Sequence, residues 1–303
     1  MINKINGNLK SRIRLKGCFA YILVLPTLII VFAVLIYPLL YSLYFSFFGW
    51  NLAKPDQIEF LGLSNYISIL SSSSFWHAIE RTAYFVGISV SIEITLGLLI
   101  ALVLNQKFIG RGFVRGLVIL PWALPTIVNG VMWKWIYNAN YGALNSLLYQ
   151  IGIIDTYKIW LKDPFIALNL VIVANIWKET PVAVLMILAA LQTFPEELYE
   201  ASSMDGTNIF GKFRHITLPL LRPVLMVLLI IKTVWAVKEF DIIYMITRGG
   251  PAEGTTIITY FIYLQTFKFL NISYGAALGY VVTFIVMILA VIYVRKITSG
   301  SVT

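Results

Sequence analysis

Long apolar runs alternate with short polar segments along this chain of 303 residues. A helix needs about 20 mostly apolar residues to cross the hydrocarbon layer of a membrane. The chain lacks the alternating strands of about ten residues that are typical of a membrane β-barrel. The pattern therefore predicts an all-α, polytopic membrane protein with about six transmembrane helices. The six apolar segments cover residues 18–48, 82–104, 116–137, 165–191, 220–247 and 270–294.

Composition supports the membrane class, since 59% of the residues are hydrophobic and only 12% are charged. The first apolar run is much longer than the apolar region of a signal peptide, and no small-x-small cleavage site follows it. We therefore expect a retained first helix. The predicted organisation is a basic cytoplasmic tail over 1–17, the first helix and an extracytoplasmic loop over 18–75, and a core of five helices over 76–298.

The positions of basic residues predict the orientation in the membrane. Loops on the cytoplasmic side of membrane proteins are enriched in Lys and Arg. With a cytoplasmic N-terminus, thirteen basic residues lie inside and five outside. We expect a multi-pass protein of the cell membrane with both termini in the cytoplasm. This topology accounts for the net charge of +9, so the charge is no sign of a nucleic-acid partner. The inside residues are Lys4, Lys10, Arg12, Arg14, Lys16, Lys107, Arg111, Arg115, Lys212, Arg214, Arg222, Arg295 and Lys296; the outside ones are Lys54, Lys158, Lys162, Arg248 and Lys268.

One polar segment, residues 193–219, interrupts the apolar pattern on the predicted cytoplasmic side. Thr193 and Glu196 have the spacing of a capping box, which predicts a short helix running to Met204. Asp205-Gly206 is a turn signal, and Thr207 is a candidate cap for a second short helix. The prediction is a helix–turn–helix outside the membrane. An amphipathic helix that touches only lipid headgroups is the alternative.

This segment resembles the cytoplasmic EAA loop of ABC importer permeases. The likeness rests on the order of Glu, Ala, a small residue, Gly and Ile-x-Leu-Pro, with Ser202 where the family usually has Ala. It implies a type I importer permease fold and a loop that docks into a separate ATPase. The implied coupling residues are Glu200, Ala201, Ser202, Asp205, Gly206, Ile216, Leu218 and Pro219.

Other motifs are similar to those of the carbohydrate-uptake branch of the same family. They include Gly62-L-x-Asn65-Tyr66, the stretch from Arg115 to Pro125, Trp133-K-W, and Gly249-Gly250-Pro251; Asn51-L-A-K-Pro55 and Trp177-K-E-T-Pro181 look most like the trehalose and maltose subgroup. The resemblance implies a subunit that forms half of a pore for a disaccharide or oligosaccharide. The implied partners are a second permease subunit, two ATP-binding cassette subunits, an extracytoplasmic sugar-binding protein and membrane lipid.

ATP hydrolysis by this chain itself is not expected. Residues 206–212 have the spacing of a phosphate-binding loop, but Phe213 stands where a hydroxyl would bind Mg²⁺. The two histidines, His77 and His215, are not placed on a shared face, so the sequence predicts no metal, no cofactor and no catalytic residue.

Polar residues within two apolar segments are candidates for a substrate pathway, because ionisable groups in a membrane span are costly unless they are paired or hydrated. They recur at spacings of three and four residues, and the second set includes an aromatic ring suited to a sugar face. In the resemblance, sugar-contacting positions fall on the same two helices. The candidates are Asn175, Lys178, Glu179, Trp235 and Glu239.

Two alternatives remain open from the sequence. The charges could pair with one another, as Lys178 with Glu239 or Lys238 with Asp241, and Glu93 could be a packing-face hydrogen bond. The chain could also be an ion-coupled secondary transporter of a small polar solute or a membrane enzyme. A secondary transporter usually shows an internal repeat, and none is found here. Co-purification with an ATPase separates these classes.

Overall fold

The computed structural model describes residues 23–299, so the predicted basic tail lies outside the described residues. The described residues form two compact units, one of 23–68 with 265–280 and one of 69–264 with 281–299. The domain boundaries expected near residues 17 and 75 stay a prediction.

The first unit contains a membrane-length helix, Leu23–Phe45, which includes the π-helical stretch η1 (Phe32–Ile36) and α2 (Tyr37–Phe45). A small antiparallel hairpin follows, β1 (Phe48–Trp50) with β2 (Ile58–Phe60), and then α3 (Ser64–Ser71) begins. The Asn65 side chain donates to the carbonyls of Ser46 and Phe48, both at 2.8 Å. The Gly62-L-x-Asn65-Tyr66 motif therefore fixes the chain where the first helix passes into the hairpin.

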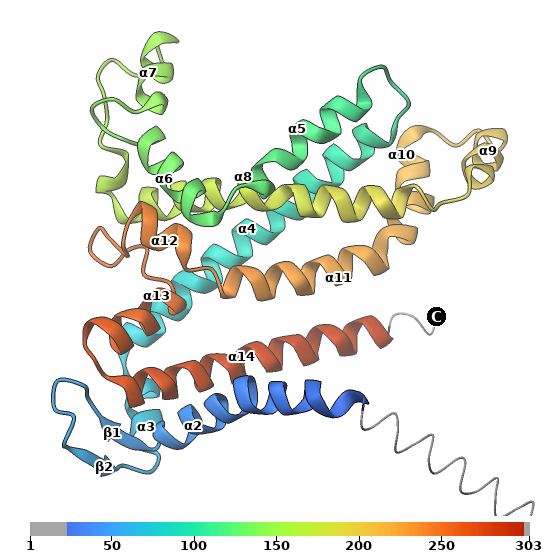
Figure 1. The fold of residues 1–303 in the computed structure, drawn as a ribbon. Helices are drawn as coiled ribbons and strands as arrows, with labels where there is room; N and C mark the ends of the chain where they lie inside the picture. Colours follow the sequence, from blue (N-terminus) through green and yellow to red (C-terminus); the bar gives the residue numbers. More distant parts are fainter. Residues whose placement is uncertain (1–22, 300–303) are drawn as a thin grey trace, which may run out of the picture. The chain divides into compact units, whose positions relative to one another are not determined.

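The second unit is helical, and Figure 1 shows its long helices α4, α8 and α11 lying alongside one another. Shorter helices cover their ends and edges. The helices are α4 (Ser73–Asn105), α5 (Arg111–Ala123), α6 (Thr126–Ile136), α7 (Ala143–Gln150), η2 (Trp160–Lys162), α8 (Pro164–Leu191), α9 (Glu196–Met204), α10 (Ile209–Lys212), η3 (Phe213–Thr217), α11 (Leu218–Val237), α12 (Asp241–Ile246) and α13 (Ile258–Tyr263); η4 (Leu264–Lys268) and α14 (Ile272–Ser299) are shared with the first unit.

Five of the six predicted spans correspond to helices long and apolar enough to cross a membrane. The third was expected to be a single helix, and this expectation was wrong. It consists of α5 and α6, bent by 95° at the break between them. Leu124 precedes Pro125 and has extended backbone, with ψ of 134°. A residue before proline is driven out of the helical region, and this explains the break.

Close packing of α4 against α8 depends on a small residue. A Cβ on Gly97 would lie 2.6 Å from the Cβ of Ala183, closer than real contacts allow. Small residues allow membrane helices to approach in this way. Buried apolar side chains surround this contact, among them Leu104, Ile187 and Leu228. The three long helices are thereby held close together.

The structure corrects two local predictions in the 193–219 segment. Thr193 donates to the carbonyl of Ala190 at the end of α8 and does not cap α9. Asn208, rather than Thr207, caps α10 by accepting the N–H of Gly211 at 2.8 Å. The second short helix leads directly into the next span, because α10, η3 and α11 follow one another without a non-helical residue.

A proline explains the π-helical stretch within this continuous helix. Pro219 has no N–H to donate to the carbonyl four residues earlier, and its ring crowds that carbonyl. The π turn instead places the N–H of Leu218 on the carbonyl of Phe213. The same arrangement occurs in η1, which ends two residues before Pro38. In both helices the extra residue per turn accommodates a proline.

Candidate functional site

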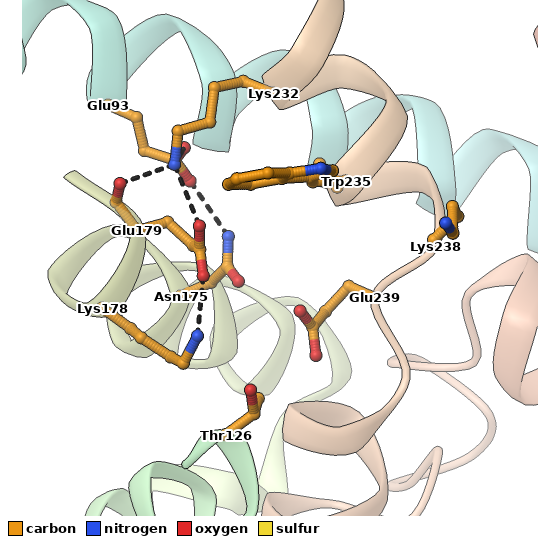
Figure 2. Close-up of a pocket in the computed structure, with 10 residues that line it drawn as sticks. Glu93, Thr126, Asn175, Lys178, Glu179, Lys232, Trp235, Lys238 and Glu239 are labelled. Carbon is orange, nitrogen blue, oxygen red and sulfur yellow. Dashed lines mark hydrogen bonds and ion pairs between the residues drawn. The ribbon is translucent and has the colours of Figure 1, made fainter. Parts of the chain in front are cut away.

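The polar residues of the long helices meet around one open pocket of about 210 Å³ (Figure 2). Residues from α4, α6, α8 and α11 line it, together with the segment between α11 and α12. All five residues predicted for the substrate pathway are among them. The lining residues are Glu93, Thr126, Asn175, Lys178, Glu179, Lys232, Trp235, Ala236, Lys238 and Glu239.

Lys232 lies at the centre of an ion-pair cluster that joins the three long helices. Its Nζ lies 3.2 Å from Glu93 Oε2 on α4 and 3.0 Å from Glu179 Oε2 on α8. It also donates to the backbone carbonyl of Glu179. The Lys232 and Glu93 side chains are only 1% and 2% exposed. A buried charge needs this degree of pairing to be tolerated.

Two more contacts complete the cluster. Lys178 Nζ lies 2.8 Å from Glu179 Oε1, and Asn175 donates to Glu93 Oε1 at 3.0 Å. The charges therefore pair with one another, as expected, but not as Lys178 with Glu239 or Lys238 with Asp241. The partner of Lys178 is its neighbour Glu179. Lys238 is exposed, and no ion pair joins it to Asp241 among residues 23–299.

Glu239 lies in a break in the fifth apolar segment. Helix α11 ends at Val237, and α12 begins at Asp241. The Glu239 carboxylate accepts the N–H of Ile242 at 3.2 Å, and its backbone carbonyl accepts the hydroxyl of Thr259. Irregular backbone at membrane depth is tolerated where it lies within protein or lines a cavity. Here it places a carboxylate at the pocket (Figure 2).

Trp235 supplies the aromatic surface of the pocket. Its side chain is 44% exposed, although neighbouring residues on α11 are buried. The ring centroid lies 5.5 Å from Lys232 Nζ, within the range of a cation–π contact. The ring is thus held on one side while much of its surface stays accessible.

Sequence reasoning noted that Lys232 shares helical spacing with Trp235 and Glu239, but Lys232, Glu93 and Thr126 were not among the residues chosen for the pathway. Glu93 and Lys232 occupy separate apolar segments, and only the packing of α4 against α11 brings them together. A signal was present, since Glu93 is the one charged residue of the apolar segment 82–104 and Lys232 follows the apolar run 223–231. Such charges imply a buried partner of opposite sign. Thr126 gives no comparable signal in the sequence.

The predicted coupling loop is closed across its turn by hydrogen bonds. Tyr199 on α9 shares one of 3.1 Å with Thr217, and Lys212 donates to Ser203. Gly206 forms the turn with a φ of +71°, as the Asp205-Gly206 signal predicts. Left-handed backbone of this kind favours glycine.

The rim of this loop exposes apolar side chains. Met204, Ile209 and Phe210 are 90%, 88% and 67% exposed. Among the motif residues, Ile216 and Ser202 are partly buried. The remaining motif residues are exposed: Glu200, Ala201, Asp205, Gly206, Leu218 and Pro219.

Comparisons with known proteins agree with this architecture. The family model described as binding-protein-dependent transport system inner membrane component matches residues 93–300. A trehalose/maltose transport system permease protein of Thermococcus litoralis is 37% identical over 96% of this chain and 98% of the relative. A sulfoquinovosyl glycerol transport permease of Agrobacterium fabrum is 36% identical over 92% and 90%. A trehalose transport permease of Mycobacterium tuberculosis is 33% identical over 91% and 87%.

A solved structure has the same fold. A chain of a bacterial ABC transporter that imports the acidic polysaccharide alginate superposes with a TM-score of 0.82 at 22% identity, covering 96% of this chain and 99% of the other. The several apolar helices and the sequence matches point to one class of membrane subunit. The chain therefore belongs to the family of inner-membrane permease components of binding-protein-dependent ABC importers.

Proposed function

We propose that this chain forms half of the translocation pathway of an ATP-driven importer for a disaccharide or oligosaccharide. Its partners are a second permease subunit, two ATP-binding cassette subunits and an extracytoplasmic sugar-binding protein. Relatives named for trehalose, maltose and sulfoquinovosyl glycerol support a sugar as the substrate class.

The pocket is the observation that carries the proposal. It combines the accessible face of Trp235 with polar groups whose hydrogen-bonding capacity is not used up, such as the Glu239 carboxylate. Sugars present C–H faces that stack on aromatic rings and hydroxyls that pair with donors and acceptors. Its volume of about 210 Å³ is below the ~300–1,000 Å³ of most ligand pockets. A pocket wall from a second permease would complete the space.

The 193–219 loop is the proposed contact with the ATPase. Exposed Met204, Ile209 and Phe210 surround the turn at Gly206, and their apolar surface suits burial in a groove of a partner. The excess of basic residues in the segments on its side supports a cytoplasmic position for this loop and for both termini. In Figure 1 the turn between α4 and α5 lies near this loop, and Lys107 pairs with Glu196 at 3.4 Å. The turn between α4 and α5 and the 193–219 loop therefore form one face of the second unit, which is the proposed ATPase contact.

Transport follows from rigid-body motion. Closure of the two ATPases on ATP moves the coupling loops of the two permeases. Because α10, η3 and α11 are continuous, motion of the loop is carried along α11 to Trp235 beside the pocket. Alternating access then exposes the pocket to one side of the membrane at a time.

The test is uptake of a panel of radiolabelled sugars by cells that express the assembled importer. Trp235→Ala and Glu239→Ala should each abolish uptake of the transported sugar, because they remove the stacking face and an acceptor. Both variants should still co-purify with the other subunits. Unchanged uptake by both variants would remove this pocket from the pathway.

The ion-coupled secondary transporter that the sequence left open has no support from the family match, and the buried charges that suggested it pair with one another.

A further inference from the structure

The side-chain amide of Asn175 is held at one end and free at the other. Its nitrogen donates to Glu93 Oε1 at 3.0 Å, and Figure 2 shows its oxygen turned away from Glu93. No hydrogen bond reaches this oxygen, Oδ1, among residues 23–299. Unlike the enclosed, unpaired Oδ1 of Asn129, it belongs to a residue that lines the pocket. The pocket therefore offers a ligand an unused carbonyl oxygen.

Glu93 and Lys232 determine which end of this amide faces the pocket. An amide can present either its oxygen, which accepts, or its NH₂, which donates. Lys232 Nζ lies 3.2 Å from Glu93 Oε2, so Oε1 is the oxygen that remains for Asn175. Because both Glu93 oxygens are used as acceptors, they select the NH₂ of Asn175 and leave its oxygen for the pocket.

Lys178 adds a donor to the same wall, about one turn further along α8. Its Nζ lies 2.8 Å from Glu179 Oε1 and has no other acceptor in the described part of the chain. An ammonium group has three protons, so two remain for a ligand. Asn175 and Lys178 both line the pocket. Helix α8 thus presents an acceptor and a donor side by side, which suits the hydroxyls of a sugar.

We propose that Glu93 is a positioning residue, which orients Asn175 so that the pocket requires a sugar hydroxyl able to donate a hydrogen bond. This inference rests on the proposed function, because it assumes that the pocket binds a sugar. A site built to pair with a hydroxyl rejects an analogue that lacks it, since a buried polar group is then left unpaired. A fluorine at this position of the sugar cannot donate, and Asn175 Oδ1 would lose its partner.

Glu93→Gln should turn the Asn175 amide over. The new side chain has nearly the same size, and its oxygen would stay beside Lys232 as the acceptor. Its NH₂ would then face Asn175, whose oxygen would turn to accept from it. Asn175 would present its own NH₂ to the pocket, so the sugar would no longer need a proton to donate at this point.

The experiment measures uptake by cells that express the assembled importer. The probe is trehalose, or maltose if the panel of sugars shows that maltose is imported, with analogues that carry fluorine in place of the hydroxyl at one ring position. In the wild type, fluorine at one position should lower uptake by about tenfold relative to the parent sugar. Glu93→Gln should reduce this loss to about twofold at that position alone.

The controls separate orientation from general damage. Glu80→Gln is the same substitution on the same helix, at a side chain that is 81% exposed, and should keep the wild-type fluorine pattern. All variants share one binding protein, so its selectivity cancels from the comparison. If Glu93→Gln does not assemble, the double variant with Lys232→Met removes the same oxygen together with the charge beside it, and it should also reduce the loss.

A loss at one position that the Glu93 variant reduces, and that Glu80→Gln retains, supports the inference. An unchanged fluorine pattern in the Glu93 variant, with uptake of the parent sugar intact, would overturn it and leave the proposed function standing. Wild-type cells that import no sugar would overturn the proposed function and this inference with it.

Discussion

Among single residues, Lys232 joins the three long helices of the second unit through its charge. Its charge is 1% exposed and connects α4, α8 and α11 through two carboxylates. Removing one partner of a buried ion pair is more damaging than removing both, because it leaves an uncompensated charge. Single and double variants of the cluster should therefore differ in stability.

Lys232→Met should destabilise the protein by about 3–5 kcal/mol, since Glu93 and Glu179 would lose their shared cation. The double variant Lys232→Met with Glu93→Gln should recover much of this loss, because Glu179 keeps Lys178. Thermal unfolding of the purified importer measures the effect. Exposed Lys238→Met is the matched control and should change stability by less than about 0.5 kcal/mol. A double variant no more stable than the single one would contradict this account.

The sequence identified five of the ten residues that line the pocket, but the ion pairs expected from it were wrong. Asn175, Lys178 and Glu179 share a helix, so their spacing was enough to group them. The contact between Glu93 and Lys232 joins two helices far apart in sequence, and no local pattern encodes it. The break at Glu239 was missed because apolar runs lie on both sides of residues 238–241 and together have the length of one span. Whether these residues bind substrate stays a prediction.

At the scale of helices, proline placement explains where the sequence prediction failed. Pro125 breaks the third apolar segment, and Pro219 introduces a π turn without ending its helix. Apolar periodicity predicts that a segment is helical, but it does not distinguish these two effects of proline. A third effect of proline is seen in α8, which contains Pro181 and still agrees with its predicted range to within one residue.

Gly206→Val tests the coupling loop at this scale. A φ of +71° costs a β-branched residue about 1–2 kcal/mol, so the turn between α9 and α10 should distort. The importer should still assemble, but sugar and binding protein should stimulate its ATPase activity much less. Gly112→Val is the control, because a Cβ there meets open space and φ is not positive. Normal stimulation in Gly206→Val would show that the turn geometry is not needed for coupling.

For the whole molecule, the sequence predicted the class better than the internal arrangement. An all-α membrane protein with five or six spans is confirmed, and so is the importer family. The hydropathy of a segment reflects whether that segment faces lipid or water, so the class of the protein can be predicted from each segment alone. The two compact units are a property of contacts between distant segments, such as the bridge from Asn51 to Asn271.

Orientation can be checked with single cysteines in a Cys18→Ser background. Ile109, in the fully exposed turn between α4 and α5, should be cytoplasmic, and Tyr141, in the loop before α7, should be external. A membrane-impermeant maleimide should label Tyr141→Cys in intact cells and Ile109→Cys only after permeabilisation. Labelling of Ile109→Cys in intact cells would contradict the predicted topology and indicate the opposite orientation.

The π turn of η3 also sets how far the loop is rotated about the helix axis relative to α11. Successive residues of an α-helix are rotated by about 100° around its axis, and a π turn contains one extra residue. Deleting one residue within 213–217 would therefore swing α9 and its exposed rim by about 100° relative to the pocket face of α11. The five residues of η3 thus set the rotation between the surface proposed to meet the ATPase and the surface proposed to meet the substrate.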